Sequence, residues 1–349
     1  MSPELALDAS KMEAQQKKIA VLILNWNGME LLKSFLPSVI EFNHEDAEII
    51  VVDNHSSDES VIYLKDSFPF IKRIEFKTNH GFAKGYNLAI EKLNHEFIVL
   101  LNTDVRVTKN WIDAPLKFLQ SNHKYAACQP KILDENKHNL FEYAGASGGF
   151  IDVFGYPFCR GRLFNYLEQD NGQYDTTIDV MWASGAALFV SNNKYKEAGG
   201  LDPDFFAHQE EIDLCWRWHN MGYKIACVPS SCVFHIGGAS LSKQDASKTF
   251  LNFRNNLVML LKNLPTQSFS VIFFRLILDG LAGLKYIFEG KPSHCFAIIK
   301  AHISFYVRIP RILINRKKAK HLSTDIKYSG SIVVDFYLRG IKVFRKLSR

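Results

Sequence analysis

Polar side chains that could bind a metal ion or a ligand follow apolar runs of strand length. Residues 96–105 are mostly apolar until the run stops on Asn102-Thr103-Asp104. Such a run is typical of a strand buried on both faces of a sheet, and open α/β sheets bind ligands beyond the carboxyl ends of their strands. A carboxylate at Asp104, with the Asn102 amide on the same side of the strand, suits a hard divalent cation that also holds phosphate oxygens. The alternative is an aspartate that only caps a turn.

A second polar pair, Asp53-Asn54, closes the apolar run 48–52. A carboxylate there can accept the imide N–H of a uracil or thymine base, and Asn54 can bond a base or ribose edge. The alternative is an Asx turn. Asn79-x-Gly81 forms a third cluster, in which glycine permits close backbone approach to a ligand. None of these loops has the GxGxxG pattern of a dinucleotide-binding fold, which argues against NAD.

An acidic cluster opens a predicted helix: Glu210, Glu211 and Asp213 follow one another within four positions. Carboxylates at a helix start interact favourably with the helix dipole, but capping does not need three of them. Phe205-Phe206 just ahead indicates partial burial. Burial raises a carboxylate pKa, so this cluster is a candidate for a general base.

His235 follows a short predicted strand and is a candidate metal ligand as a neutral imidazole, the alternative being a structural histidine. Cys227 and Cys232 lie near it, but no second ligand pair completes a zinc site. The six cysteines form no CxxC pair, and the polar start of the chain resembles neither a signal peptide nor a membrane span. We therefore expect reduced thiols in a cytoplasmic protein.

Composition places the chain among ordinary globular proteins. It has 349 residues, 47% hydrophobic and 22% charged, with a net charge of +6 and a pI of about 8.8, which is enough for one large domain and a smaller one. Basic residues concentrate in 308–320 and 339–349, whereas 202–213 is acidic. The basic tail lacks interleaved aromatic platforms, so nucleic-acid binding is not expected.

Strands and helices alternate through the first hundred residues. Apolar spacing predicts strands at 19–24, 48–52, 71–76 and 96–105, and helices at 29–41, up to 66, and 86–93, with 79–85 as a loop. Ser57 or Asp58 is expected to cap the second helix. This alternation predicts an α/β fold with a doubly wound, mainly parallel sheet.

The middle of the chain is less regular. Residues 143–179 are rich in Gly, Asp, Asn and Tyr without clear periodicity, which is typical of a functional or mobile segment, here a candidate for acceptor binding. The pattern then predicts a strand at 180–190 interrupted at Ser184-Gly185, helices at 192–198 and 211–221, and extended pieces at 223–229 and 232–235.

Three helices are predicted near the C-terminus, at 248–264, 269–289 and 294–313. The second has the length of a membrane span, but Arg275, Asp279 and Lys285 would make crossing costly. We expect helices lying at an anionic membrane surface, aided by the basic tail. The alternative is a helical subdomain packed on the sheet domain.

Taken together, residues 19–240 resemble glycosyltransferase family 2, with the GT-A fold, in its rhamnosyltransferase-like branch. The matching segments occur in the order expected for that family: VLILNWNG (21–28), VVDNHSSDES (51–60), NHGFAKGYN (79–87), LLNTDV (100–105), WASGAALFV (182–190), GGLDPDFFAHQEEIDLCWR (199–217) and VFHIGGAS (233–240). The helical C-terminal third carries no motif that matches.

The resemblance implies roles for these residues. Asp104 would be the metal-binding acid of the DxD-type motif, with Asn102 in place of its first aspartate, and His235 would complete a Mg²⁺ or Mn²⁺ site. Glu211 falls where the family places its catalytic base, usually an aspartate, and Glu210 is the second candidate. The nucleotide and its sugar–diphosphate would be bound by Asn25, Asp53, Asn54, Asn79, Gly81, Trp182, Ser184 and Gly185.

The implied activity is inverting, metal-dependent hexosyl transfer from a nucleotide-diphosphate sugar to a lipid-linked cell-surface polysaccharide acceptor, with rhamnose from dTDP-rhamnose as the first expectation. The expected organisation is a tail at 1–17, a catalytic domain at 18–242 and a membrane-surface region at 243–349, peripheral on the inner face of the plasma membrane. Two alternatives are a nucleotidyltransferase acting on sugar phosphates and a non-catalytic membrane-associated scaffold. A nucleotidyltransferase would be expected to have a Gly-rich, Lys/Arg-bearing opening loop, which this sequence lacks.

Overall fold

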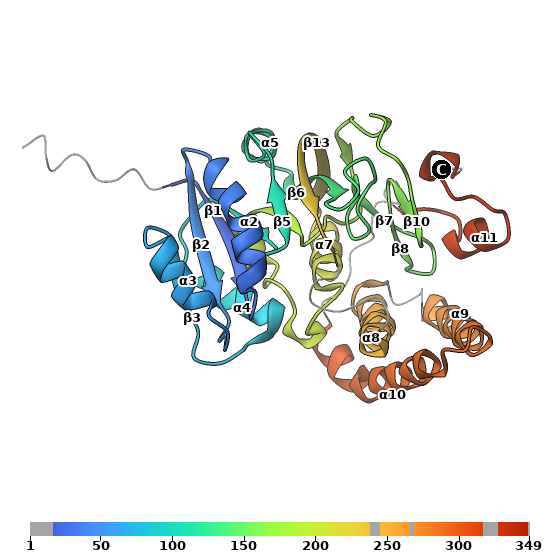
Figure 1. Cartoon of the computed structure of the whole chain (residues 1–349). Helices are drawn as coiled ribbons and strands as arrows, with labels where there is room; N and C mark the ends of the chain where they lie inside the picture. Colours follow the sequence, from blue (N-terminus) through green and yellow to red (C-terminus); the bar gives the residue numbers. More distant parts are fainter. Residues whose placement is uncertain (1–16, 238–244, 266–268, 317–326, 348–349) are drawn as a thin grey trace, which may run out of the picture.

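The computed structural model describes residues 17–237, 245–265, 269–316 and 327–347. The prediction of a disordered or loosely helical tail at 1–17 therefore falls almost wholly outside the described residues. Figure 1 shows a sheet domain with three long helices gathered beneath one end of it.

The N-terminal half is a parallel βα repeat, as predicted. Its strands are β1 (Ile19–Asn25), β2 (Ala47–Asp53), β3 (Lys72–Glu75) and β4 (Phe97–Leu101), and its helices are α2 (Met29–Glu41), α3 (Ser60–Ser67) and α4 (Gly81–Glu91). β1 lies between β2 and β4 in parallel register, with Asn25 opposite Asp53. The carboxyl ends of these strands therefore lie along one edge of the sheet.

Antiparallel strands extend this half into a mixed sheet. They include β12 (Ala187–Ser191), which pairs with β4 and with β6 (Tyr125–Asp134). The full order is β11-β13-β6-β12-β4-β1-β2-β3, where β11 is Ile178–Asp179 and β13 is Lys224–His235. A further strand, β5 (Val105–Val107), pairs with β13. The predicted α/β architecture is confirmed, with these antiparallel additions.

Alternate residues of β1 belong to two different hydrophobic cores, one on each face of the sheet. Leu22 packs in the core that contains α4, whereas Val21 and Ile23 pack in the core that contains α2 and α3. α5 (Asp113–Ser121) joins the second core, and α6 (Asn192–Glu197) and α7 (Glu210–Asn220) join the first. β1 and β4 are almost entirely apolar because both of their faces are covered, whereas the edge strand β3 is charged and partly exposed.

Three local predictions differ from the structure. The loop predicted at 79–85 is wrong, because α4 already begins at Gly81, where the Asn79 side chain accepts the Gly81 N–H. The predicted pieces at 223–229 and 232–235 are a single strand, β13, with a register irregularity between Cys227 and Cys232. The N-cap of α3 is Glu59 without a side-chain cap bond, although Asp58 accepts the Ser60 N–H.

Segment 143–179, which shows no clear periodicity in the sequence, contains a small second sheet. Its strands are β7 (Gly149–Ile151), β8 (Pro157–Cys159), β9 (Arg162–Leu163) and β10 (Tyr166–Leu167), in the order β10-β9-β8-β7. These strands are too short to show periodicity in the sequence. Gly149 lies against Trp182, where an added Cβ would come within 2.1 Å of the indole ring.

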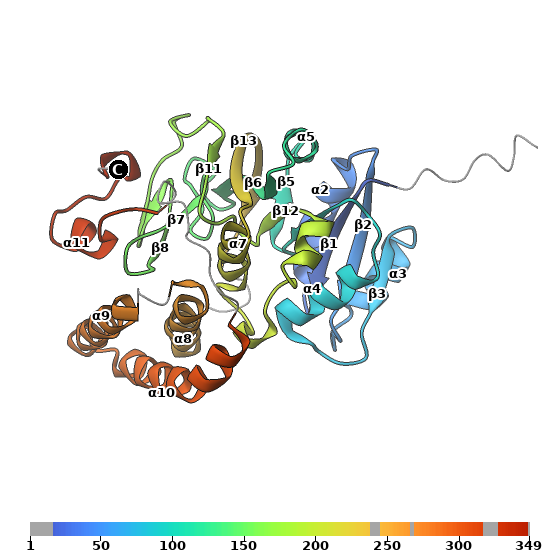
Figure 2. The same cartoon turned by 180° about the vertical axis from the view of Figure 1, so that it is seen from behind.

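The C-terminal helices are α8 (Ala246–Asn263), α9 (Phe269–Phe288), α10 (Pro292–Asn315) and α11 (Ile332–Tyr337), followed by a 3₁₀ turn at Phe344–Lys346. Both views place α8, α9 and α10 together, away from β1–β3, and α11 beside the small sheet (Figures 1 and 2). None of the helices in the described ranges is long and apolar enough to cross a bilayer.

A buried polar network joins one face of α9 to its neighbours. Arg275 pairs with Asp279 at 2.7 Å, and its guanidinium lies 3.6 Å from the centre of the Tyr156 ring. It also donates to the side-chain oxygen of Asn256 in α8. α9 therefore packs on α8 and on the connection between β7 and β8, as the alternative prediction of a packed helical subdomain required.

Candidate active site

The strongest candidate centre joins Asp104 and His235, which are 131 positions apart in the chain. β5 and β13 pair so that His235 lies opposite Val105, the neighbour of Asp104. The Nε2 atom of His235 is 3.1 Å from Oδ1 of Asp104, and the two residues are 5% and 6% exposed. Burial by itself lowers the pKa of His235, but Glu142 and Asp104 together outweigh it and raise the pKa to about 10.

This pair fits one corner of a divalent-cation site. Two ligands at right angles around Mg²⁺, each about 2.1 Å from the ion, stand roughly 3 Å apart, close to the 3.1 Å between Nε2 and Oδ1. Within the described ranges, no group of three or more His, Cys, Asp or Glu residues has metal-binding spacing. Mg²⁺ commonly takes one or two protein ligands and fills the rest with phosphate and water oxygens, so the pair suffices.

Asn102 lies one residue beyond the end of β4, at the same edge of the sheet. Its backbone N–H donates to the carbonyl of Ala186, 3.0 Å away. This bond holds the 102–104 segment against the start of β12.

Glu211 approaches the same edge from α7. A Cβ added at Gly185 would lie 3.8 Å from the Glu211 Cβ, and Gly185 precedes the Ala186 that bonds Asn102. Oε2 of both Glu210 and Glu211 is buried without a hydrogen-bond partner. Burial raises the pKa of Glu211 to about 7 and, with the Glu211 charge as a second cause, raises the pKa of Glu210 well above its usual range. A carboxylate in this state can accept a proton near neutral pH.

The loop that leads into α7 has an unusual backbone. Phe206, His208 and Gln209 have φ angles of 66°, 69° and 71°, a conformation that costs free energy for residues other than glycine. Asn255 of α8 donates its side-chain amide to the carbonyls of Phe205, Ala207 and His208 at 2.8–3.0 Å. The sequence alone did not predict this role. The signal available was the polar run Arg254-Asn255-Asn256 between the apolar Phe253 and the apolar run 257–261.

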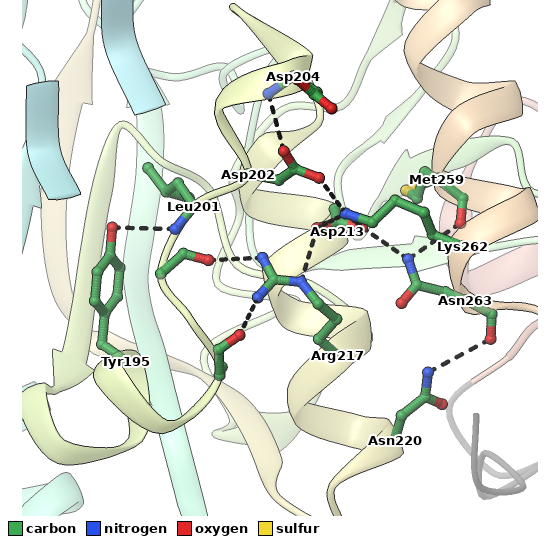
Figure 3. Close-up of polar contacts among 12 residues, drawn as sticks. Tyr195, Leu201, Asp202, Asp204, Asp213, Arg217, Asn220, Met259, Lys262 and Asn263 are labelled. Carbon is green, nitrogen blue, oxygen red and sulfur yellow. Dashed lines mark hydrogen bonds and ion pairs between the residues drawn. The ribbon is translucent and has the colours of Figure 1, made fainter. Parts of the chain in front are cut away.

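Ion pairs and hydrogen bonds around the buried Asp213 also hold α7 in place (Figure 3). Asp213, which is fully buried, accepts from Arg217 at 2.8 Å and from Lys262 of α8 at 2.9 Å. Lys262 also reaches Asp202, and Asn263 donates to Asp213. Burial alone would raise the pKa of Asp213, but Lys262 and Arg217 lower it overall. Asp213, grouped with the catalytic candidates by sequence, is thus a structural anchor.

The predicted nucleotide-binding residues meet at the ends of β1 and β2. Asn25 donates to Asp53 at 3.2 Å, and the other Asp53 oxygen accepts the Ser56 N–H at 3.1 Å. Asn54 donates to the Asn79 side chain at 3.0 Å and to the carbonyl of Gly81 at 3.1 Å. Oδ1 of Asn25 is buried without a partner. The structure therefore brings these five residues together, with Asp53 also forming the local turn.

Trp182, Ser184 and Gly185 do not share one environment. The Trp182 indole is buried and donates to the carbonyl of Phe150 at 3.0 Å, so it fastens β7 to the main sheet. Ser184 is buried, and its backbone N–H donates to Gln129 at 2.9 Å. Of the three, Gly185 has a described contact with Glu211.

Residues 20–186 match the sequence profile of a family described as Glycosyl transferase family 2. Among curated proteins, the chain is 24% identical to the low-salt glycan biosynthesis hexosyltransferase Agl10 of Haloferax volcanii, over 79% of this chain and 87% of that protein. It is 23% identical to the N-acetylglucosaminyl-diphospho-decaprenol L-rhamnosyltransferase of Mycobacterium tuberculosis, over 66% of this chain and 79% of that one.

Among solved structures, the chain resembles GalNAc-T7 crystallised with UDP, GalNAc and Mn²⁺, with a TM-score of 0.59 and 16% identity. The likeness covers 89% of this chain and 60% of GalNAc-T7, and at this identity it speaks for the fold alone. The fold is therefore GT-A, and the sequence match to glycosyltransferase family 2 covers residues 20–186, slightly less than half of the chain.

Proposed function

We propose that the protein transfers a sugar from a nucleotide-diphosphate donor to an acceptor hydroxyl, with inversion at the anomeric carbon and dependence on a divalent cation. The observation that carries this proposal is the convergence of the Asp104–His235 pair and Glu211 on one edge of the sheet. Rhamnose from dTDP-rhamnose is the first donor to test, and a lipid-linked saccharide is the proposed acceptor.

Asp104 and His235 would hold Mg²⁺ or Mn²⁺, with Asn102 beside them. When bound, the cation neutralises charge on the departing nucleoside diphosphate. The Asn25, Asp53 and Asn79 cluster would bind the nucleoside, and Gly185 would leave room for the sugar next to Glu211. Glu211 would take the proton of the acceptor hydroxyl as its oxygen attacks the anomeric carbon from the face opposite the leaving group. Glu210 is the alternative base.

Two similar proteins support this choice of substrates. The mycobacterial relative is a rhamnosyltransferase that acts on a diphospho-decaprenol-linked sugar, which agrees with a lipid-linked acceptor. The GalNAc-T7 structure was solved with UDP and Mn²⁺, which agrees with a cation at the nucleotide.

A membrane-surface location is part of the proposal and rests on α9 and α10. Large apolar side chains at three- and four-residue spacing are exposed along each helix, among them Phe273, Ile277, Leu281, Leu284 and Phe288 on α9 and Phe296, Ile299, Ile303, Val307 and Ile314 on α10. The sequence from 316 to 320 adds four basic residues. An apolar helical stripe that is followed in the sequence by positive charge suits an anionic lipid surface on the inner face of the plasma membrane.

The decisive experiment incubates the full chain with Mn²⁺, a panel of UDP-, GDP- and dTDP-sugars and a prenyl-diphosphate-linked saccharide. We expect one donor to yield a glycosylated lipid and free nucleoside diphosphate, and Glu211→Gln to lose this product. Glu197→Gln, at the exposed end of α6, is the control. Release of pyrophosphate would instead indicate a nucleotidyltransferase, and no turnover of any donor would favour the scaffold reading.

A further inference from the structure

The second ring nitrogen of His235 faces a carboxylate that the sequence analysis did not single out. Nδ1 of His235 is buried without an aligned hydrogen-bond partner and lies 3.4 Å from Oε1 of Glu142, on the ring edge opposite Asp104. Glu142 is only 2% exposed. It lies in the connection between β6 and β7, and β6 is the strand beside β13.

Glu142 is held in place by its own segment. Its backbone N–H donates to the carbonyl of Ile132 in β6 at 3.1 Å. Its second oxygen, Oε2, accepts the Ala144 N–H at 2.5 Å, which leaves Oε1 for His235. The carboxylate therefore has one oxygen committed to the chain and one turned to the imidazole.

Gly237 preserves the space that this arrangement needs. It lies two residues after His235 with a φ of +68°, and a Cβ added there would come within 2.6 Å of Oε1 of Glu142. A side chain at this position would thus displace the carboxylate from His235. The turn after β13 and the connection after β6 fit together around this one contact.

The chemistry of imidazole gives the contact a consequence. A neutral histidine can ligate a metal through one nitrogen only if the other carries the hydrogen. A carboxylate that accepts this hydrogen fixes the tautomer and the ring orientation, and makes the ligating nitrogen more basic. Here the nitrogen that faces Asp104 is Nε2. When Nε2 ligates a cation it gives up its hydrogen, and Nδ1 carries the hydrogen that remains.

We infer that Glu142 is a positioning residue for the metal site: its carboxylate accepts the Nδ1–H of His235 and so directs the Nε2 lone pair to the cation beside Asp104. This inference rests on the proposed function. Glu142 is not a third ligand of that cation, because it meets the ring at the opposite edge from Asp104.

The test measures Mn²⁺ binding directly, by titrating the full chain and following free Mn²⁺ by electron paramagnetic resonance. We expect Glu142→Gln to weaken Mn²⁺ binding about 10- to 100-fold, as is typical when the partner of a metal-bound histidine is lost. Glutamine has a single acceptor oxygen and cannot serve both His235 and the Ala144 N–H. Glu168→Gln is the matched control, since Glu168 is also buried and accepts from Tyr174 and the Phe344 N–H.

A double-mutant cycle with His235→Ala separates positioning from a general structural effect. If Glu142 acts through His235, Glu142→Gln adds no further loss of Mn²⁺ affinity in the His235→Ala background. Equal Mn²⁺ affinity in the wild type and Glu142→Gln, or an undiminished Glu142 effect without His235, overturns the inference and leaves the proposed function standing. A wild-type chain that binds no Mn²⁺, even with UDP or dTDP, overturns this inference together with the metal part of the proposed function.

Discussion

Asn255 donates its side-chain amide to the carbonyl of His208 at 2.8 Å, so a helix from the C-terminal third holds the loop that precedes the candidate base. This contact crosses the boundary that the sequence suggested near residue 242. The same amide also reaches the carbonyls of Phe205 and Ala207. Helix α7, which carries the candidate base, therefore depends on α8 for its position.

Replacing Asn255 tests this dependence. Asn255→Leu leaves buried carbonyls unsatisfied around a strained loop, at a cost of about 1–3 kcal/mol for each group. We expect a lower melting temperature and a reduced kcat, with the Kd for the nucleotide unchanged, because the nucleotide-binding residues lie on other elements. Asn122→Leu, which removes one similar bond to the Phe118 carbonyl in α5, is the control. Unchanged kcat in a folded Asn255→Leu protein would argue against a positioning role.

The pH dependence of transfer follows from Glu211. Its pKa is raised to about 7 by burial, and only the deprotonated form can act as a base, so the rate should rise as pH increases through about 7. Glu211→Gln should reduce kcat about 10²- to 10⁴-fold, the usual contribution of a general base. A rate that is flat between pH 6 and 8 would count against Glu211.

The same substitution should stabilise the protein at alkaline pH. A carboxylate whose pKa is higher in the folded than in the unfolded chain destabilises the fold above the unfolded value, and increasingly so as pH rises. We therefore expect the melting temperature of Glu211→Gln to exceed that of the wild type more at pH 8 than at pH 5. Thermal denaturation at both pH values measures this difference, and a larger gain at pH 5 would contradict the burial argument.

Metal-dependent donor binding should require Asp104. Removing its carboxylate leaves His235 as the remaining member of the pair, and we expect Asp104→Ala to abolish the Mn²⁺-dependent part of nucleotide-sugar binding. Isothermal titration with and without Mn²⁺ separates this part from binding by the nucleoside alone. Asp113→Ala, in the exposed first turn of α5, is a control. Unaltered Mn²⁺-dependent binding in Asp104→Ala would move the metal site elsewhere.

Lys262 should matter more for stability than a surface lysine does. Lys262→Met would leave Asp213 fully buried with one cationic partner fewer, and breaking a buried pair of this kind should cost about 2–4 kcal/mol. Lys65→Met removes an exposed pair with Glu75 and should cost about 1 kcal/mol or less. Urea denaturation of both variants gives the comparison, and equal losses would show that the Asp213 cluster contributes little.

The membrane proposal is tested by flotation with vesicles. Leu281 and Ile303 are 57% and 58% exposed on α9 and α10, and their joint replacement by glutamate should abolish binding to vesicles containing anionic lipid. Ile62 and Phe70, 60% and 70% exposed on the N-terminal half, are matched control positions for the same change. Equal flotation of both double variants would show that α9 and α10 do not bind the membrane.

The parallel half of the fold, and most of the residues at its edge, could be predicted from the sequence alone. Buried parallel strands are continuous apolar runs, and the polar residues that end them fall at one edge whatever lies further along the chain. Helix α2 was therefore predicted with the bounds it has in the structure, and the residues expected at this edge are hydrogen-bonded there, Asn25 to Asp53 and Asn54 to Asn79.

Contacts between residues far apart in the sequence could not be predicted and became visible in the folded structure. The Asp104–His235 distance depends on the register of β5 on β13, and the role of Asn255 depends on where α8 packs. No local sequence pattern marks Glu142, because its proposed role depends on contacts with His235 and Gly237, almost a hundred residues later. The free energy of such contacts is set by packing and burial after the chain has folded, and no short-range periodicity encodes it.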